Sequence, residues 1–243
     1  MVPKGHSLGK DTIYLIFMEK LITHQASDKT IDLIGIGNAI VDILSNVEDE
    51  FLERNNLIKG SMNLIGIQDS EKILEKCSII KKISGGSSAN TVVSLANLGN
   101  KVEFIGRVKN DYFGNFFSND IKESGTIFNS KPIQSDASSA HSIILITPDA
   151  QRTMCTYLGA SVEFEQSNLN YDSIKNSKYL YLEGYLWDSD LAKEAFIKAV
   201  ESDKNSAFGG VVLFNKKITI KLAEKILNKF FEIVIAPGFD KKS

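Results

Sequence analysis

The sequence predicts an α/β protein with a doubly wound sheet and a small β-rich lid. One reason is the apolar run "IDLIGI" at 31–36, because unbroken hydrophobic strands are typical of parallel sheets that are covered on both faces. A second reason is the alternation of strand-like and helical segments after it. A third is the segment 141–158, in which two strand-like runs flank the turn sequence "PDAQ". A hairpin added to an α/β sheet is the usual material of a lid.

The other elements follow along the chain. Two helices are expected from the spacing of apolar residues. The first covers about 88–98 and ends at Gly99, the residue type that is favoured just past a helix C-terminus. The second is "SDLAKEAFIKAVES" at 189–202, with Ser189 or Asp190 as its N-cap. The remaining predicted strands are 102–106, 141–147, 152–158 and 178–183.

The chain of 243 residues is long enough to bury a sizeable core, and we divide it into three parts. Residues 1–29 begin without any period and are expected to be an N-terminal extension. Residues 30–202 contain the alternating α/β pattern and the lid hairpin 141–158. Residues 203–243 differ in character and are expected to form a separate α/β tail.

Composition excludes several classes of function. The chain has 28 basic and 30 acidic residues, so its net charge of −2 gives no electrostatic footprint for nucleic acid. Cys77 and Cys155 form no CxxC pair and are expected to be buried thiols in a reducing compartment. The histidines His6, His24 and His141 lack metal-ligand spacing, so no metal site is expected from them. Apolar runs stay well short of the ~18 residues of a membrane span, and we expect a cytoplasmic protein without membrane partners.

Two glycine-containing loops are similar to nucleotide-binding motifs but do not satisfy them. "GHSLGKD" at 5–11 is one residue too short for GxxxxGK[ST], ends in aspartate and follows no strand. "GIGNAI" at 35–40 does follow a strand, but Ile40 occupies the place of the third small residue of a dinucleotide fold. Neither loop is taken as a nucleotide site.

The strongest candidate site combines Asp42 with "GGSSAN" at 85–90. Gly85 and Gly86 let the backbone adopt positive φ or come close to a ligand, and the following helix directs its free N–H groups to the same place. Asn90 adds a donor and an acceptor. Asp42 follows a buried strand, where open α/β sheets bind ligands. Two ordinary interpretations stay open at this point: Asp42 as a helix cap or turn former, and the glycine stretch as a turn capped by serine.

The longer segment "GGSSANTVVSLANLG" resembles the N-terminal signature of the PfkB carbohydrate kinases, the ribokinase-like family that includes adenosine kinase. Neighbouring motifs agree in order. "GIGNAIVDIL" resembles the first strand with its substrate aspartate, and "FIGRVKNDYFGN" resembles F-x-G-x-x-G-x-D-x-x-G without the middle glycine. "QRTMCTYLGAS" and "YLYLEGYLW" resemble later parts of the adenosine-kinase-like branch. The resemblance covers about residues 31–200 and implies a ribokinase-like fold.

This resemblance implies a small-molecule sugar or nucleoside as substrate. Asp42 would accept hydrogen bonds from its ring hydroxyls, with Asn38 nearby. Gly85 and Gly86 would form the floor under the sugar, and Asn90 would bind another hydroxyl. Carboxylate and amide groups discriminate well between hydroxyl patterns.

Two further roles and an assembly are implied in the same way. Arg152 would belong to the lid side that closes on the substrate and excludes water. Glu183 would be a polar wall residue near the sugar. Members of the family often form homodimers through the lid strands, and the hairpin 141–158 would do so here.

The resemblance also implies ATP and Mg²⁺ as cofactors, because these kinases transfer the γ-phosphoryl group to a hydroxyl. The family places its catalytic aspartate in a G-x-G-D motif, and no such motif occurs in this sequence. The nearest string is "PGFD" at 237–240, and the N-x-x-E motif associated with magnesium is also absent. The catalytic residue is therefore unassigned, and we expect the C-terminal nucleotide half to be missing.

The tail 203–243 resembles a different protein. "SAFGG" and "IVIAPGF", with a helix expected between them, are similar to part of the formyltransferase domain of the bifunctional AICAR transformylase and IMP cyclohydrolase. The lysine–histidine segment of that domain is absent, so we expect no formyl transfer.

Three functions therefore stay open for the chain. It is a sugar or nucleoside kinase, a fragment that binds the sugar or nucleoside without phosphorylating it, or an inactive chimeric product.

Overall fold

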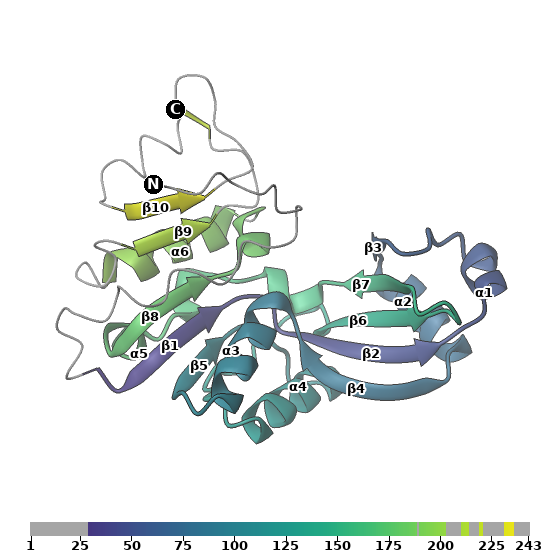
Figure 1. Cartoon of the computed structure of the whole chain (residues 1–243), viewed down its shortest axis with the longest axis horizontal. Coiled ribbons are helices and arrows are strands. Elements are labelled where there is room, and N and C mark those ends of the chain that lie inside the picture. The colour runs from purple at the N-terminus through teal and green to yellow at the C-terminus, as the bar shows by residue number, and fades with distance from the viewer. Residues whose placement is uncertain (1–28, 189, 203–209, 214–218, 221–230, 236–243) are drawn as a thin grey trace, which may run out of the picture.

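The computed structural model describes residues 29–188, 190–202, 210–213, 219–220 and 231–235. Figure 1 shows two main sheets, a core sheet and a lid sheet, joined where β1 (Ile31–Ile36) is followed by β2 (Ile40–Asn46). No helix among the described residues is long and apolar enough to cross a membrane.

The core sheet has three parallel strands. β1 lies in the middle, between β5 (Val102–Ile105) and β8 (Ser177–Leu182). The predicted strands at 31–36, 102–106 and 178–183 are confirmed to within one residue at each end. Their short apolar runs form strands because both sheet faces are covered.

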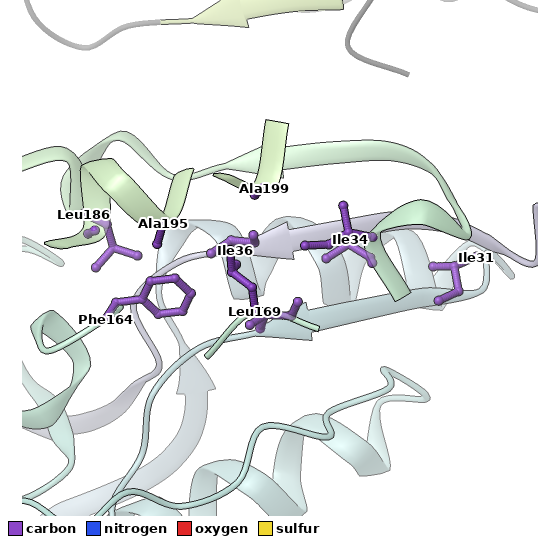
Figure 2. Close-up of a cluster of buried hydrophobic side chains, with 11 residues drawn as sticks. Ile31, Ile34, Ile36, Phe164, Leu169, Leu186, Ala195 and Ala199 are labelled. Atoms are coloured by element: carbon purple, nitrogen blue, oxygen red, sulfur yellow. The ribbon is translucent and has the colours of Figure 1, made fainter. Parts of the chain in front are cut away.

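Helices cover both faces of the core sheet, so the doubly wound prediction is confirmed. On one face lie α3 (Ser87–Asn97) and α4 (Tyr112–Glu123), where Val92 and Phe117 pack with Phe104. On the other face lie α5 (Tyr171–Lys175) and α6 (Asp190–Ser202). Figure 2 shows Ile34 and Ile36 of β1 packed there with Phe164, Ala195 and Ala199.

The predicted helix boundaries also agree with the structure. Helix α3 starts at Ser87 and is followed by Leu98 and by Gly99, whose φ of 86° ends it as the sequence predicts. Helix α6 starts at Asp190, and Ser189 lies outside the described residues. Three short 3₁₀ helices complete this part of the chain: η1 (Gly159–Val162), η2 (Gln166–Asn168) and η3 (Gly184–Asp188).

The lid sheet has five strands in the order β3-β7-β6-β2-β4. The predicted hairpin is confirmed as β6 (Ala140–Ile146) and β7 (Arg152–Tyr157), which pair antiparallel. It is not an isolated appendage, because β6 also pairs in parallel with β2. The edge strands β3 (Met62–Leu64) and β4 (Ile79–Gly85) were not among the sequence predictions.

One face of the lid sheet is covered by α1 (Asp49–Arg54) and α2 (Ile67–Lys76). Leu52 and Ile73 of these helices pack against Ile143, Leu145 and Cys155 of the sheet. The lid therefore has a core of its own.

Two described strands lie in the tail. β9 (Gly210–Leu213) and β10 (Phe231–Ile235) pair in parallel. β9 begins at the last glycine of "SAFGG", and β10 ends with the "IVI" of "IVIAPGF". The rest of both strings lies outside the described residues, and so does the helix expected between them, except for Ile220.

Candidate functional site

The candidate site lies where the core sheet meets the lid sheet. The loop 37–39 connects β1 to β2, β4 ends there at Gly85, and helix α3 begins at Ser87. β8 ends beside the same loop, because the Glu183 N–H donates to the Ile36 carbonyl oxygen over 2.9 Å. Four chain segments therefore meet at one place.

Asp42 lies within β2, between β6 and the edge strand β4 of the lid sheet. The interpretation of Asp42 as a helix cap or turn former is wrong, since it pairs with Ile83 of β4 and Ser142 of β6. It also does not follow β1 directly, as expected, but stands on the next strand. Among the described residues no donor forms a hydrogen bond with its carboxylate.

Gly85 lies against this carboxylate. A Cβ added at Gly85 would overlap Asp42, so only glycine lets the two strands place the carboxylate here. Burial raises the pKa of Asp42 to about 6, and the positive charge of Arg152 opposes the rise. The carboxylate is thus poorly solvated and has no protein donor, which leaves it able to accept hydrogen bonds from a ligand.

Gly86 forms the second half of the glycine pair. Its φ is 99°, a value that side chains rarely adopt, and an added Cβ would overlap the Asn38 carbonyl oxygen. Gly86 is also the N-cap of α3, with no side-chain cap. The alternative interpretation of a serine-capped turn is therefore wrong.

Asn38 and Glu183 are joined directly. The Asn38 N–H donates to Glu183 Oε2 over 2.5 Å, and the Ser87 hydroxyl donates to Glu183 Oε1. Asn38 and Glu183 are each 3% exposed, and Asn38 Oδ1 has no hydrogen-bond partner among the described residues. An unsatisfied buried acceptor of this kind costs about 1–3 kcal/mol, which a bound hydroxyl or water offsets.

Asn90 and Arg152 stand apart from this cluster. Asn90 is exposed in the first turn of α3, and its N–H donates to the Gly86 carbonyl oxygen over 2.9 Å. Arg152 is exposed at the start of β7, and it acts on Asp42 through its charge. Apart from this bond within the helix backbone, no hydrogen bond or ion pair between described residues ties Asn90 or Arg152 to the other candidates.

The sequence analysis missed four residues of the site. Ser142 and Thr156 lie on the same face as Asp42, are buried, and share a hydrogen bond of 2.8 Å between their hydroxyls. Gly37 leaves room for Glu183, which an added Cβ would overlap, and Ser87 bonds to the same carboxylate. The signals in the sequence are the period of two along the hairpin strands and the second glycine of "GIG", which fails as a nucleotide motif but gives room for a carboxylate.

The described residues include no group of three or more His, Cys, Asp or Glu side chains that could hold a metal ion. His141 is buried in the lid, where Ser70 Oγ lies 2.6 Å from its Nε2. Cys77 and Cys155 are free thiols.

Known proteins are similar to this chain over much of its length. Residues 54–229 match the model of the pfkB family carbohydrate kinases. The chain is 31% identical over 150 residues to 5-dehydro-2-deoxygluconokinase of Clostridium perfringens, which covers 60% of this chain and 44% of that protein. It is 30% identical over 135 residues to probable fructokinase-6, chloroplastic, of Arabidopsis thaliana, which covers 55% and 34%. The chain thus spans less than half the length of these relatives.

Solved structures show the same similarity. Adenosine kinase from Sinorhizobium meliloti superposes with a TM-score of 0.67 at 36% identity, covering 81% of this chain and 59% of that one. A probable sugar kinase from Rhizobium etli superposes with a TM-score of 0.67 at 35% identity, covering 79% and 56%. The ribokinase-like fold is therefore confirmed.

Both ends of the family match bear on predictions made from the sequence, the first on the site residues and the second on the tail. It begins after Asn38 and Asp42, and it runs past residue 203 to residue 229. The division of the chain at 203 stays a prediction, and these comparisons do not show the formyltransferase resemblance of the tail. With 54–229 matched, this chain belongs to the pfkB family of carbohydrate kinases.

Proposed function

We propose that this chain binds the acceptor of a sugar or nucleoside kinase and presents one of its hydroxyls for phosphorylation. The observation that carries this proposal is the Asp42 carboxylate, which lies between β4 and β6 without a donor from the described residues. A partly buried carboxylate in that state gains most from a ligand that brings several hydroxyl donors. The relatives named above, which phosphorylate such molecules by name, support the same class of ligand.

The roles of the residues follow from their positions. Asp42 accepts hydrogen bonds from ring hydroxyls, and the Ser142–Thr156 hydroxyl pair extends the polar surface beside it. Gly85 and Gly86 let the ligand approach the backbone closely. Asn90, in the first turn of α3, binds a further hydroxyl.

Arg152 and the hairpin that carries it form the outer wall. Closure of the lid over a bound sugar removes water, which would otherwise compete as phosphoryl acceptor. Arg152 brings a positive charge to this side of the site.

ATP and Mg²⁺ would supply the phosphoryl group and the charge that stabilises its transfer. The described residues do not offer a set of carboxylates suited to Mg²⁺. The function that we propose for the described residues is therefore acceptor binding.

We also infer a homodimer through the lid. Met62, Leu64 and Met154 lie side by side on the face that α1 and α2 leave uncovered, and they are 51%, 63% and 36% exposed. Apolar side chains grouped in this way mark interaction surfaces. Light scattering on the purified chain gives the mass that tests this. The free thiols Cys77 and Cys155 support a location in the cytoplasm.

Two assays made on the same preparation test the proposed function. Calorimetry with adenosine, ribose and fructose measures binding, and labelled ATP with the same acceptors measures transfer. Binding together with transfer supports a kinase, whereas binding without transfer supports a chain that only holds its ligand. No binding of any acceptor, together with a broad and non-cooperative melting curve, would mean an inactive product.

A further inference from the structure

Glu183 makes more contacts than a residue that simply lines a sugar site. Both oxygens of its carboxylate accept hydrogen bonds from the protein, one from the Asn38 N–H and one from the Ser87 hydroxyl. Its own N–H donates to the Ile36 carbonyl oxygen over 2.9 Å. One residue therefore ties the end of β8 to the β1–β2 loop and to the start of α3.

The surrounding residues are shaped to allow these contacts. Gly37 lacks the Cβ that would overlap Glu183 Oε2, and Gly86 lacks the Cβ that would overlap the Asn38 carbonyl oxygen. Asn38 is thus bonded to Glu183 at its N–H, and its carbonyl oxygen lies close to the backbone of Gly86. Since Glu183 is 3% exposed, little of its surface is left for a ligand.

The bonds fix groups that face the ligand. Asn38 lies in the short loop 37–39 that leads into β2 and Asp42, and its side-chain Oδ1 is buried without a partner among the described residues. Ser87 is the first residue of α3, whose free N–H groups and positive dipole end point toward the site. A change in Glu183 therefore shifts both the loop and the helix start.

We propose that Glu183 is a positioning residue: its carboxylate sets the spacing between the Asn38 loop and the N-terminal turn of α3 and does not bind the ligand itself. This rests on the proposed function, because it concerns the same site. It differs from the role that the resemblance implies, in which Glu183 is a wall residue beside the sugar.

The test uses Glu183→Gln, which has nearly the same shape. Its amide oxygen can accept from the Asn38 N–H while its NH₂ donates to the Ser87 hydroxyl oxygen, so both contacts persist but the negative charge is lost. We expect adenosine, used as the probe, to bind about tenfold more weakly to this variant, since the two charge-assisted hydrogen bonds that fix the loop and the helix start become weaker neutral ones. The matched control is Glu75→Gln, which removes the same charge from an exposed position on α2 and should bind as the wild type does.

Nuclear magnetic resonance separates positioning from general stability. The Asn38 amide proton, donating over 2.5 Å to a carboxylate, should resonate far downfield and move upfield in Glu183→Gln only. It should stay downfield when adenosine is added to the wild type, because the bond to Glu183 is kept. An upfield shift on adding adenosine would mean that Oε2 leaves Asn38 for the ligand, and would overturn the proposal.

A second variant covers the case in which Glu183→Gln does not fold. Ser87→Ala removes one bond at an exposed residue, and it should weaken adenosine binding several-fold while the Asn38 amide stays downfield. If wild type binds adenosine and both variants bind it equally well, the positioning role is wrong and the proposed function stands. If wild type binds no adenosine, the proposed function fails for that ligand, and the positioning role fails with it.

Discussion

The two faces of the lid sheet differ in what their side chains do. The side chains of the closed face are fully buried: Val41, Ile43, Ile143, Leu145 and Cys155. The last three pack under α1 and α2, and the first two pack with residues of the core sheet and its helices. On the open face the same strands carry Asp42, Leu44, Ile144, Arg152 and Met154, which are partly or fully accessible. Because side chains alternate along a strand, one set of residues stabilises the lid and the next set is free to bind a ligand or partner.

The contrast is sharpest at two neighbouring isoleucines. Ile143→Ala empties a fully buried position and should lower the free energy of unfolding by about 2–5 kcal/mol. Ile144→Ala is the matched control, because its side chain points to the open face, and it should cost roughly 1 kcal/mol or less. Urea unfolding of both variants measures the difference. Equal losses would mean that the open face is covered in solution.

The next largest effect on stability is expected at Gly86, at the junction of the two sheets, and Gly99 after α3 serves as its control. Gly86→Ala combines a positive φ with overlap against Asn38, and it should cost about 2–3 kcal/mol and abolish ligand binding. Gly99→Ala has a similar φ of 86° and open space around its Cβ, so it should cost about 1 kcal/mol and leave binding unchanged. Thermal unfolding and calorimetry compare the two. If Gly99→Ala harmed binding as much as Gly86→Ala, close approach at Asn38 would not be the reason for glycine.

On the open face, the ionised carboxylate of Asp42 should lower the stability of the folded chain. Its pKa is raised to about 6 from an ordinary value of 3.8, so the native state binds more protons than the unfolded state between these values. The contribution of Asp42 to stability therefore falls as the pH rises from about 4 to about 6, by at most about 3 kcal/mol. Asp42→Asn carries no charge to lose a proton from, so its free energy of unfolding should exceed that of wild type by more at pH 8 than at pH 4.5. Unfolding curves of both proteins at both pH values measure this. If the difference between variant and wild type were the same at the two pH values, the burial argument would be contradicted.

His141 on the closed face should have the opposite dependence. Burial lowers the pKa of His141, so the unfolded state binds the extra proton as the pH falls through about 6.5. Its Nδ1 lies 3.2 Å from the Ser139 carbonyl oxygen, which only accepts, so Nδ1 carries the proton and Nε2 accepts from Ser70. The negative charges of Asp111 and Glu71 raise the pKa of His141 and so oppose part of the effect of burial. His141→Gln should therefore lose less stability than wild type between pH 7 and pH 5, which unfolding curves at those values measure.

Much of the fold could be predicted from local patterns. A few neighbouring residues suffice to predict three of its features: the strand at 31–36, the hairpin around "PDAQ" and the end of α3 at Gly99. The edge strands β3 and β4 could not be predicted in this way. β4 begins with exposed residues at Ile79 and Ile80 and becomes buried only near Gly85, so its period is mixed.

The candidate site was predicted in its residue types better than in its contacts. Asp42, Gly85, Gly86, Asn38 and Glu183 do meet at the junction of the two sheets. Contacts between positions 145 residues apart, such as Asn38 with Glu183, depend on how β1 and β8 pair, and no local pattern encodes that. The resemblance implies a place for Glu183 beside the sugar, but its bonds to Asn38 and Ser87 become visible only in the folded chain.

Calorimetric titration of adenosine into wild type, Asp42→Asn and Asp136→Asn tests the central claim most directly. Asp136 is exposed, so its variant controls for the loss of one negative charge. The account predicts binding to wild type and to Asp136→Asn with the same affinity, and a loss of tenfold or more in Asp42→Asn, because a charged acceptor of hydroxyl hydrogen bonds is removed. Equal affinity of all three proteins for adenosine would contradict the account, since the open carboxylate of Asp42 would then play no part in binding.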